Sequence, residues 1–339
     1  MTSRVLVVKA LNHEPVPRIP RDVWLPAGED AAENEDLAEL LVRFPSDILT
    51  PNTTFESCQK YRRKPNRKGE FTDLWGCVWG PAENGAAAEL KLSPLADWEK
   101  LVHFRPPEEL FDSGRFTRAS RLCGSTNRFV LAWSEVRPLD RLRQLHGENT
   151  LAELTHGGKE IRQLLAILHE AHCKELERWA QSEVDAVAFR DDWGTPGGLV
   201  LHTDVWRDLF RPLYREYCKI LHAQDKFVFF HSLGNILDLF GELVRAGVDA
   251  IHADLHLMNL DRLLNRYRGS VTFWGGFDEK RLLNPGSLAE FREAVSTFRR
   301  ALDVGAGGVI AQCRWQRGIR LQILAAFFEQ WCVPLPVPS

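Results

Sequence analysis

The chain has 339 residues, of which 44% are hydrophobic and 26% are charged, and its formal net charge is -3. This length suits one α/β barrel or two ordinary domains, and the composition is that of a globular protein. The only short basic stretch is YRRKPNRKG at residues 61–69, so we expect no nucleic-acid partner.

The sequence begins MTSRVLVVKALNHEP, without a long apolar core, and no apolar run reaches the ~18 residues that a membrane span needs. We therefore expect no signal peptide and no membrane association. Seven scattered cysteines without CxxC spacing favour reduced thiols over a disulfide framework, which suggests a cytoplasmic protein.

A helix is expected at residues 3–11, and short apolar runs after it predict eight strands. The strands are expected at residues 21–25, 47–52, 128–133, 185–190, 227–230, 249–253, 270–275 and 307–311. Helical periodicity falls at residues 34–44, 151–179, 204–224, 237–246, 261–267, 288–303 and 319–331. Strands that alternate with helices form a parallel sheet, and eight such units predict a single (β/α)8 TIM barrel.

Residues 53–127 are less regular. Within them FTDLWGCVWG, residues 71–80, alternates enough for a strand of a hairpin, so we interpret this region as an elaboration inserted after the second strand. The barrel domain is then expected to span residues 1–331, followed by a C-terminal tail at residues 332–339.

In such a barrel the site lies at the carboxyl ends of the strands. The residues at the expected ends are mostly polar, and they include two histidines and one thiol. They are Asp22, Trp24, Asn52, Ser134, Glu135, Asp191, Asp192, His231, Ser232, His252, Asp254, Asp278, Gln312 and Cys313.

Asp191 and Asp192 follow a buried strand directly, and adjacent buried acids are costly without partners. They could bind a metal, a substrate cation or pyrrole N–H groups. Alternatively, one caps the next turn and the other pairs with an arginine. We predict Asp192, Asp191 and Glu135 as catalytic residues, with Glu135 orienting the substrate.

Arginines at the presumed mouth suggest an anionic small-molecule substrate, because guanidinium groups bind carboxylates bidentately. Structural ion pairs with Glu135 or Asp191 are the alternative for Arg137, Arg190 and Arg314. Tryptophans near strand ends suit an aromatic pocket, although they also serve as core fillers. The predicted substrate-binding residues are Asn52, Trp133, Arg137, Trp193, Asp254, Trp274 and Arg314.

His231 and Cys313 are both zinc-ligand types at expected strand ends. The alternatives are a hydrogen-bonded core histidine and a small buried thiol. His252 and His256 could add a ligand. The six other cysteines, including Cys58 and Cys173, are expected to have no chemical role.

Several segments resemble the uroporphyrinogen decarboxylase superfamily, which includes uroporphyrinogen decarboxylases and methylcobalamin:coenzyme M methyltransferases. They are ALNHEPVPRIPRDVW, FRDDWGTPGGLVLHTDVWRDLFRPLYREY, FFHSLGN, LVRAGVDAIHADLHLMNLDRL and VTFWGGFDEKRLL. The resemblance runs from about residue 4 to residue 331 and implies a (β/α)8 barrel.

The decarboxylase branch implies a metal-free site, in which an aspartate holds pyrrole N–H groups and arginines after the first strand hold carboxylates. Here the chain after Trp24 reads LPAGEDAAEN, with acids where arginines are expected. FPSDIL resembles the aspartate motif, but its Asp47 opens the second strand and so falls at the wrong end of the barrel.

The methyltransferase branch implies zinc held by a His-x-Cys pair after the fifth strand and a cysteine after the eighth. His231 and Cys313 match the outer two positions, and Leu233 occupies the middle one. The resemblance therefore implies zinc or another divalent metal at His231 and Cys313, completed by Asp192, Asp254 or His252.

Three hypotheses follow. The first is a metal-assisted methyltransferase that uses a corrinoid as co-substrate, carried by a separate protein. The second is a cofactor-independent decarboxylase or lyase for a porphyrinogen-like or other anionic cyclic substrate, with Asp192 as its electrostatic centre. The third is a non-enzymatic tetrapyrrole-binding module.

Overall fold

A computed structural model describes residues 1–25, 34–51, 69–81 and 88–332 of the chain. Eight parallel strands form one sheet in the hydrogen-bonded order β1-β13-β12-β11-β10-β7-β6-β2. Their bounds are β1 Arg21–Trp24, β2 Ile48–Leu49, β6 Phe129–Trp133, β7 Ala186–Arg190, β10 Phe227–His231, β11 Ala250–His252, β12 Thr272–Trp274 and β13 Val309–Arg314. The outer strands β1 and β2 meet where the Asp47 amide donates to the Arg21 carbonyl at 2.8 Å, so the predicted barrel is confirmed.

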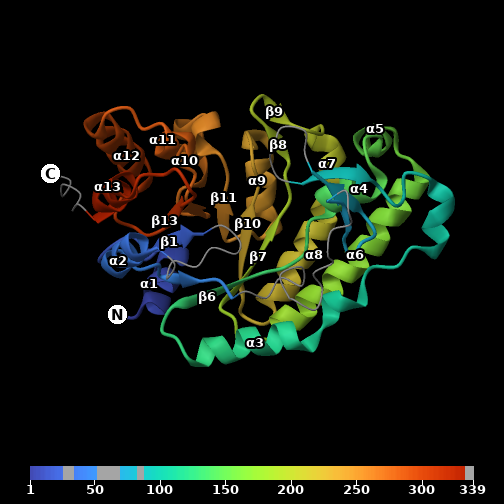
Figure 1. Ribbon diagram of the computed structural model, residues 1–339, viewed down its shortest axis with the longest axis horizontal. Helices are drawn as coiled ribbons and strands as arrows, with labels where there is room; N and C mark the ends of the chain where they lie inside the picture. Colours follow the sequence, from blue (N-terminus) through green and yellow to red (C-terminus); the bar gives the residue numbers. More distant parts are fainter. Residues whose placement is uncertain (26–33, 52–68, 82–87, 333–339) are drawn as a thin grey trace.

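Helices surround this barrel (Figure 1). They are α1 Ser3–Leu11, α2 Glu35–Arg43, α3 Ser113–Gly124, α4 Pro138–His146, α5 Thr150–His156, α6 Lys159–Ala180, α7 Thr203–Leu209, α8 Arg211–His222, α9 Leu237–Ala246, α10 Leu260–Tyr267, α11 Lys280–Leu283, α12 Leu288–Leu302 and α13 Leu321–Cys332. None of these described helices is both long and apolar enough to cross a membrane.

Two of the expected helices are each divided in two. The helix expected at residues 151–179 is interrupted by Gly157, whose φ of +78° ends α5 in a left-handed cap. The helix expected at residues 204–224 breaks at Phe210, and Pro212 then lies in the first turn of α8. Proline has no N–H to continue the preceding helix, so α7 and α8 are separate.

The core has two parts because strand side chains alternate between the two faces of the sheet. Inward-facing residues fill the barrel, and α1 packs beneath them through Val7 and Leu11. Outward-facing residues pack against the surrounding helices in a second, larger cluster. In β13, for example, Ile310 belongs to the inner cluster, and its neighbours Val309 and Ala311 belong to the outer one.

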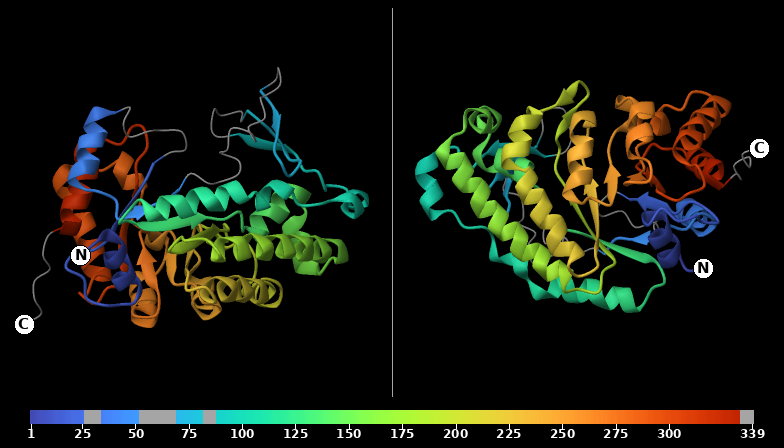
Figure 2. Two further views of the ribbon diagram at one scale, coloured as in Figure 1. Left: turned by 90° about the horizontal axis from the view of Figure 1, so that it is seen from below. Right: turned by 180° about the vertical axis from the view of Figure 1, so that it is seen from behind.

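The predicted insertion is a three-stranded antiparallel sheet of β3 (Phe71–Thr72), β4 (Val78–Gly80) and β5 (Glu89–Leu92). Figure 2 shows it standing away from the barrel. Residues 71–80, expected to be one strand, form a complete hairpin. Asp73 holds its turn by accepting from the Trp75 and Cys77 amides at 2.9 Å each, and Gly76 has a φ of +87°. Two 3-10 helices, Trp98–His103 and Glu108–Phe111, lead from this sheet to α3.

Some sequence predictions fall on residues outside the described part of the chain. These are Asn52 as a substrate-binding residue, Cys58 as a thiol without a chemical role, and the tail apart from Cys332, which ends α13.

Candidate functional site

Inward-facing side chains gather at the carboxyl ends of the barrel strands. We call them the mouth set: Asp22, Trp24, Trp133, Arg190, His231, His252, Trp274, Gln312 and Arg314. Side chains along a strand alternate between its two faces, so residues two or four positions apart face the same way. Most of the mouth set lies two or four residues from a residue of the inner cluster on the same strand, and the rest belongs to that cluster or contacts it. Among the residues that the structure describes, seven of the eight barrel strands contribute to the mouth set.

Asp22 is a buried acid in this set, with 2% of its surface exposed. Its Oδ2 atom accepts hydrogen bonds from the indole N–H groups of Trp24 at 2.7 Å and Trp274 at 2.8 Å. Burial raises the pKa of Asp22 to about 6, although the two indole bonds oppose this rise. Asp22 is therefore poised to exchange a proton near neutral pH. The sequence places it at a strand end but does not single it out as catalytic.

His231 and His252 form a directly bonded pair, with 2.8 Å between their Nδ1 atoms. His252 Nε2 lies 3.0 Å from Gln312 Oε1. Burial lowers the pKa of His252 to about 4, and burial followed by the charge of His252 lowers the pKa of His231 well below its usual value. Both rings are therefore neutral at pH 7.

The hydrogen-bond order fixes the tautomers of this pair. If His252 Nε2–H donates to Gln312, then His252 Nδ1 accepts from His231 Nδ1–H, and His231 Nε2 keeps its lone pair. Gly275 makes room for this arrangement, because a Cβ atom there would lie 2.5 Å from Gln312 Oε1. His231 Nε2 is therefore a candidate base.

Three tryptophans of the mouth set lie close to one another. The Trp24 ring centroid lies 4.8 Å from that of His252, 5.1 Å from that of Trp274 and 5.9 Å from that of Trp133. Trp133 and Trp274 are thus at the mouth. Trp193 is not: it is buried on the outer side of β7, where its Nε1–H donates to the Tyr214 hydroxyl at 2.8 Å. The sequence prediction for Trp193 is therefore not supported by its position.

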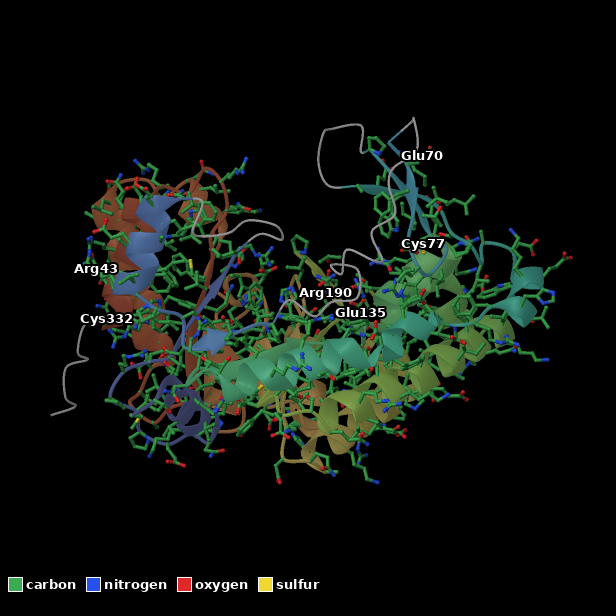
Figure 3. All side chains as sticks on the ribbon, turned by 60° about the horizontal axis from the view of Figure 1, so that its bottom comes forward. Arg43, Glu70, Cys77, Glu135, Arg190 and Cys332 are labelled. Atoms are coloured by element: carbon green, nitrogen blue, oxygen red, sulfur yellow. The ribbon has the colours of Figure 1, made fainter. Side chains whose placement is uncertain are left out.

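Two arginines flank the histidine pair. The charges of Arg314 and Arg190 both lower the pKa of His231, after burial and His252, so both guanidinium groups lie near it. Arg314 Cζ is 5.2 Å from the Trp24 ring centroid. Arg190 lies beside Glu135 (Figure 3), and the nearby charge of Arg137 lowers the pKa of Arg190. The mouth therefore has two guanidinium groups next to neutral imidazoles. Acids neighbour both of them, because Glu279 lies 3.7 Å from Arg314, and Glu135, Asp140 and Asp192 lie near Arg190.

Asp191 points outward and serves the structure. Its carboxylate accepts from the Leu139 and Asp140 amides at the start of α4, at 2.9 and 2.8 Å, and from the Tyr214 hydroxyl at 2.9 Å. It is fully buried, and burial followed by repulsion from Asp140 raises its pKa well above the usual value. This is the helix-capping alternative considered for the acid pair, and it puts Asp191 away from the mouth set.

Asp192 and Asp254 hold the loop after β10. The Leu233 amide donates to Asp192 Oδ1 at 2.9 Å, and the Gly234 amide donates to Asp254 Oδ2 at 2.7 Å. The backbone of Gly234 also touches that of Gly194, since a Cβ atom on Gly234 would lie 2.3 Å from the Gly194 carbonyl carbon. Both carboxylates are half-buried and position the segment that follows His231.

Asp140 is a residue near the mouth that the sequence does not indicate. Its carboxylate accepts from the Asp192 amide at 3.3 Å, and burial followed by the charge of Asp192 raises its pKa. Asp140 lies inside α4 and not at a strand end, so a search of strand ends misses it.

Glu135 is buried in an ion-pair network with Arg137 and Arg141. Burial opposes its ionisation, but these two arginines lower its pKa. Its amide donates to Glu175, which pairs with Arg115 at 2.9 Å. Arg137 thus forms the structural ion pair considered as its alternative, and Glu135 holds Arg137 and lies near Arg190.

The structure does not bring His231 and Cys313 together. His231 faces into the barrel, and Cys313 lies with Val309 and Ala311 on the outward side of β13. Gln312 takes the inward position beside His252. Leu233, at the middle position of the implied ligand set, has 46% of its surface exposed. A zinc site needs at least three protein ligands, and this donor set does not fit one.

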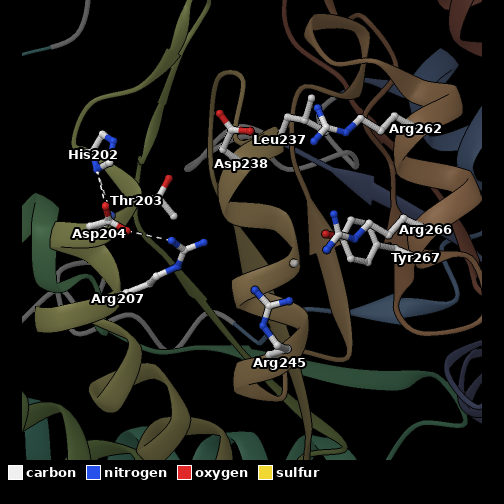
Figure 4. A pocket seen from close by; sticks show the side chains of 11 residues that line it. His202, Thr203, Asp204, Arg207, Leu237, Asp238, Arg245, Arg262, Arg266 and Tyr267 are labelled. Atoms are coloured by element: carbon white, nitrogen blue, oxygen red, sulfur yellow. Dashed lines mark hydrogen bonds and ion pairs between the residues drawn. The ribbon is translucent and has the colours of Figure 1, made fainter.

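A surface cavity of about 340 Å³ lies outside the barrel, between α7, α9 and α10. Four arginines and Tyr267 line it (Figure 4). Glu242 pairs with two of them, Arg207 and Arg245, at 2.7 Å each. None of the residues that line this cavity belongs to the mouth set.

His256, which could add a metal ligand according to the sequence, lies near an acid instead. Its Nε2 atom is 3.8 Å from Asp278 Oδ1.

Comparisons with known proteins agree with this fold. A family model described as Uroporphyrinogen decarboxylase (URO-D) matches residues 144–312, from the end of α4 to Gln312. No curated protein sequence matches the chain. A methyltransferase from Methanosarcina mazei has a similar structure, with a TM-score of 0.66, 14% sequence identity and 98% of each chain covered. The match over residues 144–312 supports the uroporphyrinogen decarboxylase superfamily for this chain, and the solved structure supports the fold.

Proposed function

We propose that this protein is an enzyme that performs acid–base chemistry on an anionic, cyclic small molecule at the barrel mouth. The reaction class that fits best is cofactor-independent decarboxylation. The observation that carries this proposal is the mouth set itself. It combines a buried acid whose pKa is about 6, a neutral histidine pair and flanking arginines.

The substrate's carboxylates would pair with Arg190 and Arg314, whose charges both act on His231. Guanidinium groups suit this task because they bind carboxylates in a bidentate manner. The indole rings of Trp24, Trp133 and Trp274 would provide an apolar surface for a flat, cyclic molecule. This geometry favours a substrate with both an aromatic or conjugated face and negative charge.

Loss of carbon dioxide leaves an electron pair on carbon, which must then take a proton. Asp22 in its protonated form can donate that proton, since its pKa of about 6 leaves part of it protonated near neutral pH. His231 Nε2 can accept a hydrogen bond or a proton from the substrate while His252 and Gln312 hold its ring. A positioned acid or base of this kind contributes about 10²–10⁴-fold to the rate.

The test is incubation of the purified protein with uroporphyrinogen, followed by chromatography for products with fewer carboxyl groups. Asp22→Asn and His231→Gln should each lower turnover about 100-fold. Cys313→Ala is the matched control, because Cys313 lies in the outer cluster on the other face of β13. Absence of product from the wild-type protein would overturn the porphyrinogen form of the proposal.

A second candidate is methyl transfer with a corrinoid as co-substrate. A separate partner protein would carry the corrinoid. The fold of the Methanosarcina mazei methyltransferase favours it. The outward orientation of Cys313 argues against the thiol-activating zinc that the resemblance implies for that branch. Demethylation of methylcobalamin in the presence of a thiol acceptor would favour this candidate over decarboxylation. Corrinoid binding with neither reaction would instead favour a non-enzymatic module.

A further inference from the structure

Helices α6 and α8 lie side by side on the outside of the barrel (Figure 2). His169 and Cys173 are four residues apart on α6 and therefore share one face of that helix. Glu216 extends from α8 toward the same place. Three different types of metal ligand thus meet between two helices, far from any residue used in the proposed reaction.

The distances between these groups match those of a metal site. His169 Nε2 lies 3.1 Å from Glu216 Oε2, and Cys173 Sγ lies 3.7 Å from His169 Nδ1 and 3.8 Å from His169 Nε2. Tetrahedral zinc, with its usual bond lengths, separates nitrogen and sulfur ligands by about 3.6 Å and nitrogen and oxygen ligands by about 3.3 Å. Little movement would be needed to place an ion between them.

A hydroxyl group supports the histidine. The Tyr217 hydroxyl is 3.2 Å from His169 Nδ1 and 3.4 Å from Nδ1 of the buried His172. It can accept from His169 Nδ1–H while donating to Nδ1 of His172. Histidine ligands commonly donate their second ring N–H in this way, which leaves Nε2 free for the metal.

The surroundings favour a cation. Three acids, Glu216, Glu177 and Glu170, lie near the Cys173 thiol and make its surroundings negative. A cation at this place would offset that negative charge and displace the thiol proton. His169 is partly accessible and the Glu216 side chain is 55% exposed, so an ion has an entry path and water can complete the coordination.

We propose that His169, Cys173 and Glu216 form a zinc-class divalent metal site that cross-links α6 and α8. It is the one trio of such ligand atoms among the described residues that lies within 4.8 Å. Mixed thiolate, imidazole and carboxylate ligands suit zinc or cobalt(II) and disfavour magnesium or calcium, which select oxygen ligands. The bound ion would stabilise the packing of these two helices. This metal site is independent of the function proposed for the barrel mouth.

The test uses the full chain, freed of metal with a chelator and titrated with cobalt(II) chloride. We expect one cobalt per chain, a thiolate-to-cobalt charge-transfer absorption and a raised thermal unfolding midpoint. Cys173→Ser should abolish the charge-transfer absorption, and His169→Gln should weaken binding at least tenfold. Tyr217→Phe should weaken it by roughly tenfold, as expected for loss of a supporting hydrogen bond.

Three control variants make the result specific. Cys332→Ser removes an exposed thiol elsewhere, and Cys313→Ala and His231→Gln remove the pair implied at the barrel mouth; all three should keep the absorption. If Cys173→Ser does not fold, protection of Cys173 from alkylation by zinc, read by mass spectrometry, replaces it. Cobalt binding without a charge-transfer absorption, an absorption that survives in Cys173→Ser, or no binding at all would overturn the proposal.

Discussion

The inward and outward faces of the barrel strands carry similar residue types with different surroundings. Asp191, on the outward side, accepts three hydrogen bonds from fixed protein donors. Asp22, on the inward side, accepts two through Oδ2 alone, and no donor from the described residues reaches its Oδ1 atom. An acid whose two oxygens both accept hydrogen bonds from the protein holds the fold together. An acid with an oxygen that no described donor reaches, held between two indole groups, can serve a substrate.

The largest stability effect is expected on the outward face. Asp191→Ala leaves the Leu139 and Asp140 amides and the Tyr214 hydroxyl without their acceptor, which should cost about 3 kcal/mol of unfolding free energy. Urea unfolding measures this loss. Asp192→Ala is the matched control and should cost about 1 kcal/mol, because it removes one accepted bond from the Leu233 amide. Equal losses in the two variants would contradict the structural role of Asp191.

The inward acid is expected to lower the stability of the fold when it ionises. The pKa of Asp22 rises from 3.8 to about 6 on folding, so the folded state binds more protons than the unfolded state between these values. Stability should therefore fall as the pH rises through this window, by up to about 3 kcal/mol. Asp22→Asn lacks this titration.

The Asp22→Asn variant should thus gain stability relative to wild type between pH 4 and pH 7, as roughly estimated from the same shift. Urea unfolding across this pH range measures the difference. A constant difference between the two proteins would show that Asp22 titrates normally and would remove it as the proposed acid.

The smallest effect is expected for Cys313. Cys313→Ala removes one buried sulfur from the outer cluster and should cost about 1 kcal/mol. It should leave the activity of the mouth set unchanged, because the side chain lies on the other side of the sheet. Loss of bound metal in this variant would contradict that orientation and restore the implied zinc site.

The sequence predicts the barrel well because strands that are buried on both faces appear as apolar runs. It also predicts that Asp47 opens the second strand, and the structure places Asp47 just before Ile48, paired with Arg18 at 2.6 Å. What it does not predict is which face each strand-end residue occupies. Side chains alternate with a period of two, so an error of one residue exchanges Gln312 with Cys313.

Other features depend on contacts between distant segments. Asp140 reaches the mouth from within α4, and Asp22 gains its raised pKa from burial beside Trp24 and Trp274. The spacing of His169 and Cys173 is visible in the sequence, but their third ligand lies 47 residues from His169, on another helix. For this reason the sequence alone predicts no chemical role for Cys173.

The most direct test of the central claim compares uroporphyrinogen turnover by the wild-type protein, His231→Gln and Cys313→Ala. The sequence predicts His231 and Cys313 as ligands of one metal, but they lie on opposite faces of the sheet. We predict roughly 100-fold lower turnover for His231→Gln and wild-type turnover for Cys313→Ala. A wild-type protein without turnover, or an equal loss in both variants, would contradict an inward-facing acid–base site.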